Sequence, residues 1–237
     1  FCYYDGSEGV NAPFWCNVAR AQWRVHKRLK PQPLFAEGAA KTHFSWHMLS
    51  RGNAFDIFKP EVLKESIRLH PAAEAPRMKQ NFTHINFGWL GYWVPDRNTV
   101  GTQPDMLEYA TSRAAAWDCP ISIHTDLKKF EDHPRTADNF EVMRRWEEVR
   151  VSDWLTQEQK LSLQNLEQEH ILLINEKNEF ELQPYDQITN VAGNSKEVRA
   201  FIFERGGSLY VVYWHISGAK KLELALNHKN IAVMENL

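Results

Sequence analysis

The chain has 237 residues, of which 43% are hydrophobic and 24% are charged, and its formal net charge is -2. This composition is typical of a globular protein, and the length is sufficient for one large core or two modest ones. The small net charge and the lack of a basic block argue against nucleic acid or an anionic membrane as the main partner, and no apolar run approaches the ~20 residues of a membrane-spanning helix.

The first part of the chain alternates between strand-like and helix-like segments. Residues 1–5 predict a buried strand, residues 13–29 an amphipathic helix, and residues 33–37 a second strand. A strand–helix–strand order predicts two parallel strands joined by a crossover helix. The alternation continues with helices expected at 60–79, 104–117 and 138–150 and strands at 84–90 and 119–124, while 43–58 fits either a strand or a short helix.

The pattern changes after residue 152. Residues 156–169 predict a helix capped by Thr156. After it, segments rich in Val, Ile, Tyr and Phe are separated by tight turns such as Arg-Gly-Gly-Ser, which is typical of antiparallel hairpins. We therefore expect an α/β domain at 1–155 with about four or five parallel strands. A linking helix and an antiparallel, sandwich-like β domain are expected at 156–237.

Two of the predicted strands end on a carboxylate followed by glycine, as Tyr4-Asp5-Gly6 and Ala36-Glu37-Gly38. Functional groups of parallel β/α folds lie at the carboxyl ends of the strands, on the loops that follow. Trp89, and His124 with Asp126, follow later predicted strands in the same way. We expect these side chains to converge on one face, although a helix N-cap or a surface charge is the simpler explanation of any single carboxylate.

Two carboxylates across a cleft are the machinery of glycoside hydrolysis. One ionised group attacks or stabilises the oxocarbenium-like carbon, and the other, protonated, delivers its proton to the leaving oxygen. The nine tryptophans of the chain also suit stacking on sugar rings, with Tyr92 and Trp93 among the aromatic candidates. The residues expected to shape the sugar site are Glu8, His47, Arg51, Trp89, His124 and Asp126.

The order strand–Asp5–helix–strand–Glu37, followed by further β/α units and an antiparallel β domain, resembles the second half of a TIM-barrel retaining glycoside hydrolase. It is similar to the α-amylase-like, α-L-fucosidase-like and endo-α-N-acetylgalactosaminidase-like groups, and the runs EGAAKTHFSWHMLSRGNAFD and SRAAAWDCPISIH resemble gut-bacterial polysaccharide-degrading hydrolases. The resemblance implies a partial (β/α) barrel, Asp5 as nucleophile and Glu37 as general acid/base.

The same resemblance implies a poly- or oligosaccharide substrate, no cofactor, and a periplasmic or extracellular location. Because the chain starts at Phe1 directly in a strand-like run, we expect an upstream part of the protein, with the first barrel strands, to be missing from it. Glu8, three residues after Asp5, is an alternative catalytic carboxylate or a sugar ligand.

Three other readings stay open. His43 and His47 have the i, i+4 spacing of a metal-dependent hydrolase, but the sequence is HFSWH and lacks the glutamate of HExxH. Glu167 and His170 have the spacing of a carboxylate–histidine metal motif, for which a helix end is the simpler explanation. No G-x-S-x-G occurs, which argues against a serine hydrolase. A non-catalytic carbohydrate-binding fragment is the remaining alternative.

Overall fold

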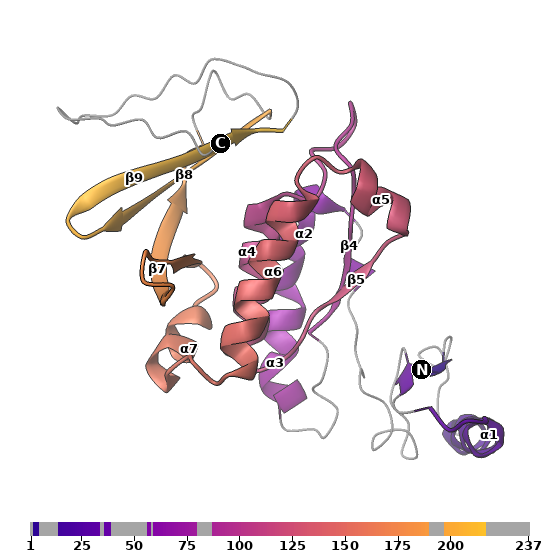
Figure 1. Cartoon of the computed structure of the whole chain (residues 1–237). Helices are drawn as coiled ribbons and strands as arrows, with labels where there is room; N and C mark the ends of the chain where they lie inside the picture. The colour runs from indigo at the N-terminus through magenta and orange to yellow at the C-terminus, as the bar shows by residue number, and fades with distance from the viewer. Residues whose placement is uncertain are drawn as a thin grey trace. The chain divides into compact units, whose positions relative to one another are not determined.

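The fold is mixed α/β (Figure 1). The computed structural model describes residues 2–4, 14–33, 36–38, 56–57, 59–79, 87–189 and 197–216. Their strands form a two-stranded parallel sheet, a three-stranded parallel sheet and a four-stranded antiparallel sheet. The chain divides into two compact units, Phe1–Pro184 and Tyr185–Leu237.

The first parallel sheet pairs β1 (Cys2–Tyr4) with β2 (Ala36–Gly38), and α1 (Trp15–Arg28) connects them. The predicted strand–helix–strand order with parallel strands is confirmed. Tyr4 and Ala36 are buried, and the Tyr4 hydroxyl donates a hydrogen bond to the main-chain oxygen of Gln22 in α1 at 3.5 Å. We infer that α1 covers the face of the sheet on which Tyr4 and Ala36 lie.

The second parallel sheet has the order β3-β4-β5. Its strands are β3 (Asp56–Ile57), β4 (Trp89–Gly91) and β5 (Ser122–His124). The connections contain the 3-10 helix η2 (Pro60–Val62), α2 (Leu63–Leu69), α3 (Pro71–Lys79) and α4 (Pro104–Ala116). Ile57 pairs with Leu90, and Leu90 with Ile123, so the apolar positions align across the sheet.

Helices cover one face of this sheet. After β5 come α5 (Leu127–Asp132) and α6 (Thr136–Val151), and α6 runs beside α4 (Figure 1). α4 brings buried alanines to this contact, and small side chains let two helices approach closely. Leu90 of β4 lies in one apolar core with Leu107 of α4 and Trp146 of α6. This core therefore lies between the sheet and the helices.

The last elements are α7 (Gln157–Leu163), β6 (Glu169–Ile174), β7 (Phe180–Gln187), β8 (Val198–Arg205) and β9 (Ser208–His215). The four strands follow one another in the sheet as β6-β7-β8-β9. β8 and β9 pair in antiparallel register from Val198–His215 to Arg205–Ser208. Gly206 and Gly207 have φ of 59° and 74°, which the tight hairpin turn requires. The predicted hairpin at Arg-Gly-Gly-Ser is confirmed.

One predicted element was wrong in length. Thr156 is the N-cap of α7 as predicted, because its side chain accepts a hydrogen bond from the Gln159 amide at 3.2 Å. The helix ends at Leu163, however, and β6 begins at Glu169, where the sequence had predicted a helix up to residue 169. The main-chain oxygens of Leu163 and Leu166 are bound by side chains of α4, which replace helical hydrogen bonds.

The barrel is not part of the observed architecture. The strands that the structure describes form three separate sheets, and no barrel closes among them. None of the helices in the described ranges has the length and apolarity needed to cross a membrane.

Candidate functional site

The predicted catalytic pair belongs to the first parallel sheet. In β2, Glu37 lies opposite Tyr3 of β1, and Gly38 lies opposite Tyr4, the residue before Asp5. The carboxyl ends of the two acid-bearing strands therefore lie at the same edge of the sheet. The side chain of Glu37, and all of Asp5, Glu8, His47 and Arg51, lie outside the described residues.

Two predicted sugar-binding residues, Trp89 and His124, lie together. The predicted place of Trp89 at the carboxyl end of a strand was wrong, because Trp89 is the first residue of β4, whereas His124 is the last residue of β5. Trp89 is next to Leu90 and His124 is next to Ile123, and Leu90 and Ile123 pair with each other and pack in the helix-covered core. Because successive strand residues face opposite sides, Trp89 and His124 occupy the face away from that core. Their rings stack with centroids 5.7 Å apart and an interplanar angle of 7°. Such a flat aromatic pair is suited to stacking on a sugar ring.

A second aromatic–polar pair follows β4. The Trp93 amide donates to Thr102 Oγ1 at 2.9 Å, and the Thr102 amide donates to the Trp93 main-chain oxygen at 2.9 Å. Thr102 therefore binds both main-chain polar groups of Trp93. The ammonium of Lys129 in α5 lies 4.8 Å from the centre of the Trp93 ring. The sequence indicated Trp93 as a stacking residue near a strand end. It carried no signal for Lys129, because that contact joins two different β/α units.

A buried polar cluster supports these strand ends. The Tyr92 hydroxyl lies 2.9 Å from Thr136 Oγ1 and accepts from Asn139 Nδ2 at 2.9 Å. His133 Nδ1 accepts from the Arg135 amide at 3.0 Å, and its ring lies 5.0 Å from the Tyr92 ring. Burial raises the pKa of Tyr92 and lowers the pKa of His133, so both are neutral near pH 7. We assign this cluster a supporting role, since Tyr92 and His133 are buried.

Asp126, a predicted sugar ligand, is the N-cap of α5. Its Oδ1 accepts from the Lys129 amide at 3.2 Å, and its Oδ2 lies 3.7 Å from Lys129 Nζ. These contacts account for an aspartate at this position by helix capping. A role in binding substrate stays a prediction.

Replacing Asp126 with alanine should lower the free energy of unfolding by about 1 kcal/mol, because the N-terminal amides of α5 lose their acceptor. Urea denaturation followed by tryptophan fluorescence measures this loss. Asp132→Ala is the matched control, since Asp132 is an exposed acid in the same helix and pairs only across one turn with exposed Lys128. Equal stability of both variants would contradict the cap.

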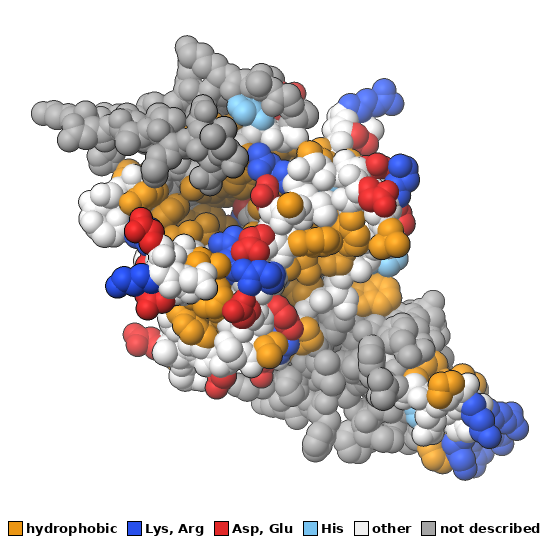
Figure 2. All heavy atoms as spheres, viewed as in Figure 1, with side chains coloured by type: hydrophobic (Ala, Val, Ile, Leu, Met, Phe, Trp, Pro, Cys, Tyr) orange, Lys and Arg blue, Asp and Glu red, His pale blue; other side chains and the backbone are white. Residues whose placement is uncertain are grey.

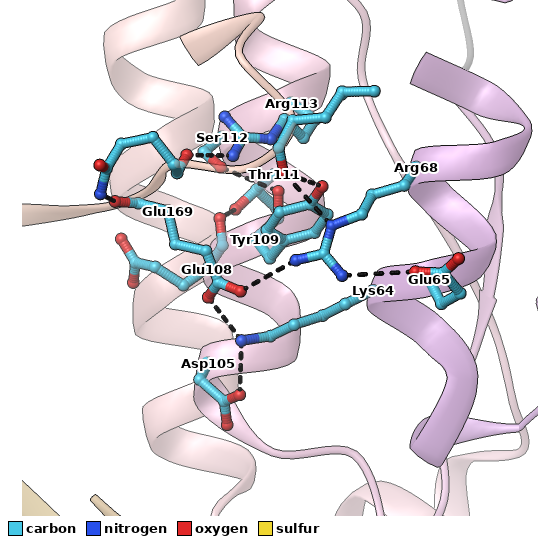
Figure 3. A network of polar contacts seen from close by, with 12 residues as sticks. Lys64, Glu65, Arg68, Asp105, Glu108, Tyr109, Thr111, Ser112, Arg113 and Glu169 are labelled. Carbon is cyan, nitrogen blue, oxygen red and sulfur yellow. Dashed lines mark hydrogen bonds and ion pairs between the residues drawn. The ribbon is translucent and has the colours of Figure 1, made fainter. Parts of the chain in front are cut away.

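A network of charged side chains joins α2, α4 and β6 (Figure 3). Lys64 of α2 lies between two carboxylates, 3.0 Å from Asp105 and 2.5 Å from Glu169. Arg68 of α2 approaches Glu169 at 3.4 Å and stacks over the Tyr109 ring at 5.0 Å. The sequence did not indicate this network, because its partners are far apart along the chain.

Arg113 of α4 extends the network into the interior. Its side chain is fully buried, and its guanidinium donates to the main-chain oxygens of Leu163 and Gln168. The guanidinium carbon lies 4.6 Å from the centre of the Tyr109 ring. Arg113 therefore binds main-chain oxygens on the connection between α7 and β6, a structural rather than a chemical task.

Glu108 of α4 is a buried titratable group in the helix core. Its Oε1 accepts from Trp146 Nε1 at 2.7 Å and from the Leu172 amide at 2.8 Å. Burial raises the pKa of Glu108 to about 7, although both hydrogen bonds and nearby Arg145 favour the ionised form. A raised pKa of this kind is typical of a catalytic acid, but Glu108 lies in the helix core and not at a strand end.

A pocket of about 380 Å³ lies against α4 and α6. Figure 2 shows hydrophobic side chains gathered between α6 and β5 on this face. The rim charges are already engaged, because Arg144 binds Glu141 and Arg150 binds Glu147. No predicted site residue lines the pocket, which is formed by Thr111, Ala114, Ala115, Cys119, Pro120, Ile121, Phe140, Met143, Arg144, Trp146, Glu147 and Arg150.

In the described part of the chain, no cluster of three His, Cys, Asp or Glu side chains is placed to hold a metal ion. His43 and His47 lie outside the described residues. His170 lies in β6 with Nε2 3.2 Å from Ser162 Oγ, and burial lowers its pKa to about 4.

Comparisons with protein-family models, curated proteins and solved structures give no match to this chain.

Proposed function

We propose that this chain is part of a retaining glycoside hydrolase that cleaves a poly- or oligosaccharide. Asp5 attacks the anomeric carbon and forms a covalent glycosyl–enzyme intermediate. Glu37 protonates the leaving oxygen and then activates the water that releases the sugar. In this proposal the two parallel sheets are parts of one (β/α) barrel, and no cofactor takes part.

The observation that carries the proposal is the register of β1 and β2. Glu37 is opposite Tyr3, and Ala36 and Tyr4 belong to the face that α1 covers. Because the two strands are parallel, their carboxyl ends lie at one edge of the sheet, which is where parallel β/α folds place their functional groups. A retaining mechanism requires the Asp5 and Glu37 carboxyl groups to be ~5–5.5 Å apart, and the proposal predicts this distance.

The arrangement of helices and side chains on the second parallel sheet also supports the proposal. Its helices cover one face, and the stacked Trp89 and His124 occupy the other. In a (β/α) barrel the helices lie outside and the opposite face lines the interior, with function at the carboxyl ends of the strands. Trp93 with Lys129 follows such an end. These pairs are the proposed sugar platforms.

A mechanism-based label tests the proposal. The protein, produced with any segment that its gene encodes before Phe1, is incubated with a panel of activated 2-deoxy-2-fluoro glycosides, which form the glycosyl–enzyme but release it slowly. We expect one covalent adduct per chain, located by peptide mass spectrometry on Asp5. Product analysis by NMR should show retention of the anomeric configuration.

An adduct on Glu8 would transfer the nucleophile to that residue, and an adduct on any other side chain would overturn the assignment. Hydrolysis with inversion would exclude the covalent mechanism. Saturable sugar binding without turnover across the panel would favour the alternative of a carbohydrate-binding protein, for which the stacked Trp89–His124 pair is equally suited.

A further inference from the structure

Residues 163–172 run from the end of α7 into β6, and we call this segment the strap. Side chains from α2, α4 and α6 bind its backbone groups, and Lys64 and Arg68 of α2 also bind the Glu169 side chain. The acceptors are the oxygens of Leu163 and Gln168 for Arg113, of Leu166 for Arg68 and Tyr109, and of Leu172 for Arg145.

The strap ends at Leu172, whose main-chain oxygen and amide are both bound by side chains. Its oxygen accepts from Arg145 Nη1 at 2.8 Å, and its amide donates to Glu108 Oε1 at 2.8 Å. The same Oε1 accepts from Trp146 Nε1 at 2.7 Å. A single buried carboxyl group of α4 thus joins β6 to α6.

This geometry does not require a charged carboxylate. Both donors reach Oε1, so Oε2 can carry a proton without the loss of either hydrogen bond. Glu108 is buried, and an ionised carboxylate in such a place loses its hydration. We therefore expect the neutral acid to hold Leu172 at a lower free-energy cost than the carboxylate does.

The surrounding charges act on Glu108 in opposite directions. Arg145 of α6 favours the carboxylate, and Asp105 of α4 favours the acid. Asp105 is itself paired with Lys64 of α2 at 3.0 Å, and Lys64 also binds Glu169 of β6 at 2.5 Å. Burial has the largest effect of all and favours the acid.

We propose that the strap is a pH-responsive attachment, in which neutral Glu108 fixes β6 to α4 and α6 and ionised Glu108 loosens it. The element with two states is the strap: attached, with the Leu172 amide protected, or locally open, with Glu108 in water. This device is independent of the proposed hydrolase activity.

The direction follows from the two pKa values. Attached Glu108 has a pKa of about 7, above its ordinary 4.5, so the attached state holds its proton to higher pH. The contribution of Glu108 therefore opposes opening most strongly below pH 4.5 and fades as the pH rises to about 7, which changes the opening equilibrium by up to roughly 300-fold. His170 of the strap acts in the opposite direction, because burial lowers its pKa from 6.5 to about 4 and its contribution favours opening as the pH falls across that range.

Hydrogen exchange of the Leu172 amide, corrected for the pH dependence of intrinsic exchange, measures this opening. His170 contributes equally to the unaltered chain and to Glu108→Gln, which keeps an oxygen acceptor but cannot ionise, so the difference between the two chains isolates Glu108. Between pH 5 and pH 7.5 we expect the protection of the unaltered chain to fall by one to two orders of magnitude relative to that of Glu108→Gln. Glu147→Gln, the same change at an exposed acid of α6, should behave like the unaltered chain.

Equal pH dependence in Glu108→Gln and the unaltered chain would overturn the proposal. A second measurement does not depend on how the variant folds. Titration of the Glu108 side-chain carbon by ¹³C NMR in the unaltered chain should show a midpoint well above that of an exposed glutamate. A midpoint below about 5 would equally overturn the proposal.

Discussion

Replacing Asp5 with asparagine is expected to lower kcat for aryl glycosides by ~10³-fold or more, because the amide cannot form the glycosyl–enzyme intermediate. KM should change little, since asparagine keeps the size and hydrogen-bonding reach of the side chain. Replacing Glu37 with glutamine should cost about 10²–10⁴-fold with leaving groups that need a proton. With a leaving group of low pKa, the first step of Glu37→Gln should recover, and azide should accelerate the second step.

The dependence on leaving group and the acceleration by azide are expected for Glu37→Gln and not for Asp5→Asn. A variant that only fails to fold would show neither effect. Asp138→Asn and Glu141→Gln are the matched controls, because both acids are exposed on α6 and bind arginines there. Both controls should retain full activity. If Asp5→Asn retains activity, the proposed mechanism is wrong. If Glu37→Gln is equally slow with every leaving group, the acid/base role is wrong.

Replacing Arg113 with alanine is expected to lower the free energy of unfolding by ~3–5 kcal/mol. The substitution leaves the main-chain oxygens of Leu163 and Gln168 buried without their donor, removes the stack on Tyr109, and opens a cavity in α4. Arg113→Lys should recover part of this loss at most, because an ammonium lacks the planar fork that reaches two oxygens. Urea denaturation at constant pH measures both variants.

The control for Arg113 is Arg144→Ala on α6. Arg144 binds Glu141 and Glu148 at 2.8 Å and 2.5 Å, but its side chain is exposed, so its removal should cost under ~1 kcal/mol. Comparable losses in the two alanine variants would mean that burial does not distinguish these arginines, and the structural role of Arg113 would be contradicted.

Local sequence signals predicted the elements that local chemistry determines. Pro104 begins α4, Thr156 caps α7, and Gly206 with Gly207 turns β8 into β9. The end of α7 was not predictable in this way. Apart from Asn165, residues 164–168 are good helix formers, and they leave the helix where side chains of α2 and α4, distant in sequence, bind their main chain.

The candidate site shows the same division. The expected position of Trp89 and His124 after predicted parallel strands led to the prediction that they lie on one face, and their rings stack. It did not indicate that Lys129 reaches Trp93, nor that Asp105, Glu108 and Arg113 of α4 would be buried. Polar residues in a helix normally predict an exposed face. Partners on α2, α6 and β6 bind Asp105 and Glu108, and main-chain oxygens of Leu163 and Gln168 bind Arg113. A single sequence contains no local trace of those contacts.

The two contacts at Leu172 also block part of an exposed strand edge. Among the described strands β6 is at the edge of its sheet, where free amides and carbonyls are a template for a foreign strand. Glu108 and Arg145 occupy one such amide and carbonyl in the middle of β6. An incoming strand therefore cannot extend the sheet across this edge without first displacing two buried side chains, so the two contacts that fasten β6 also make it a poor template.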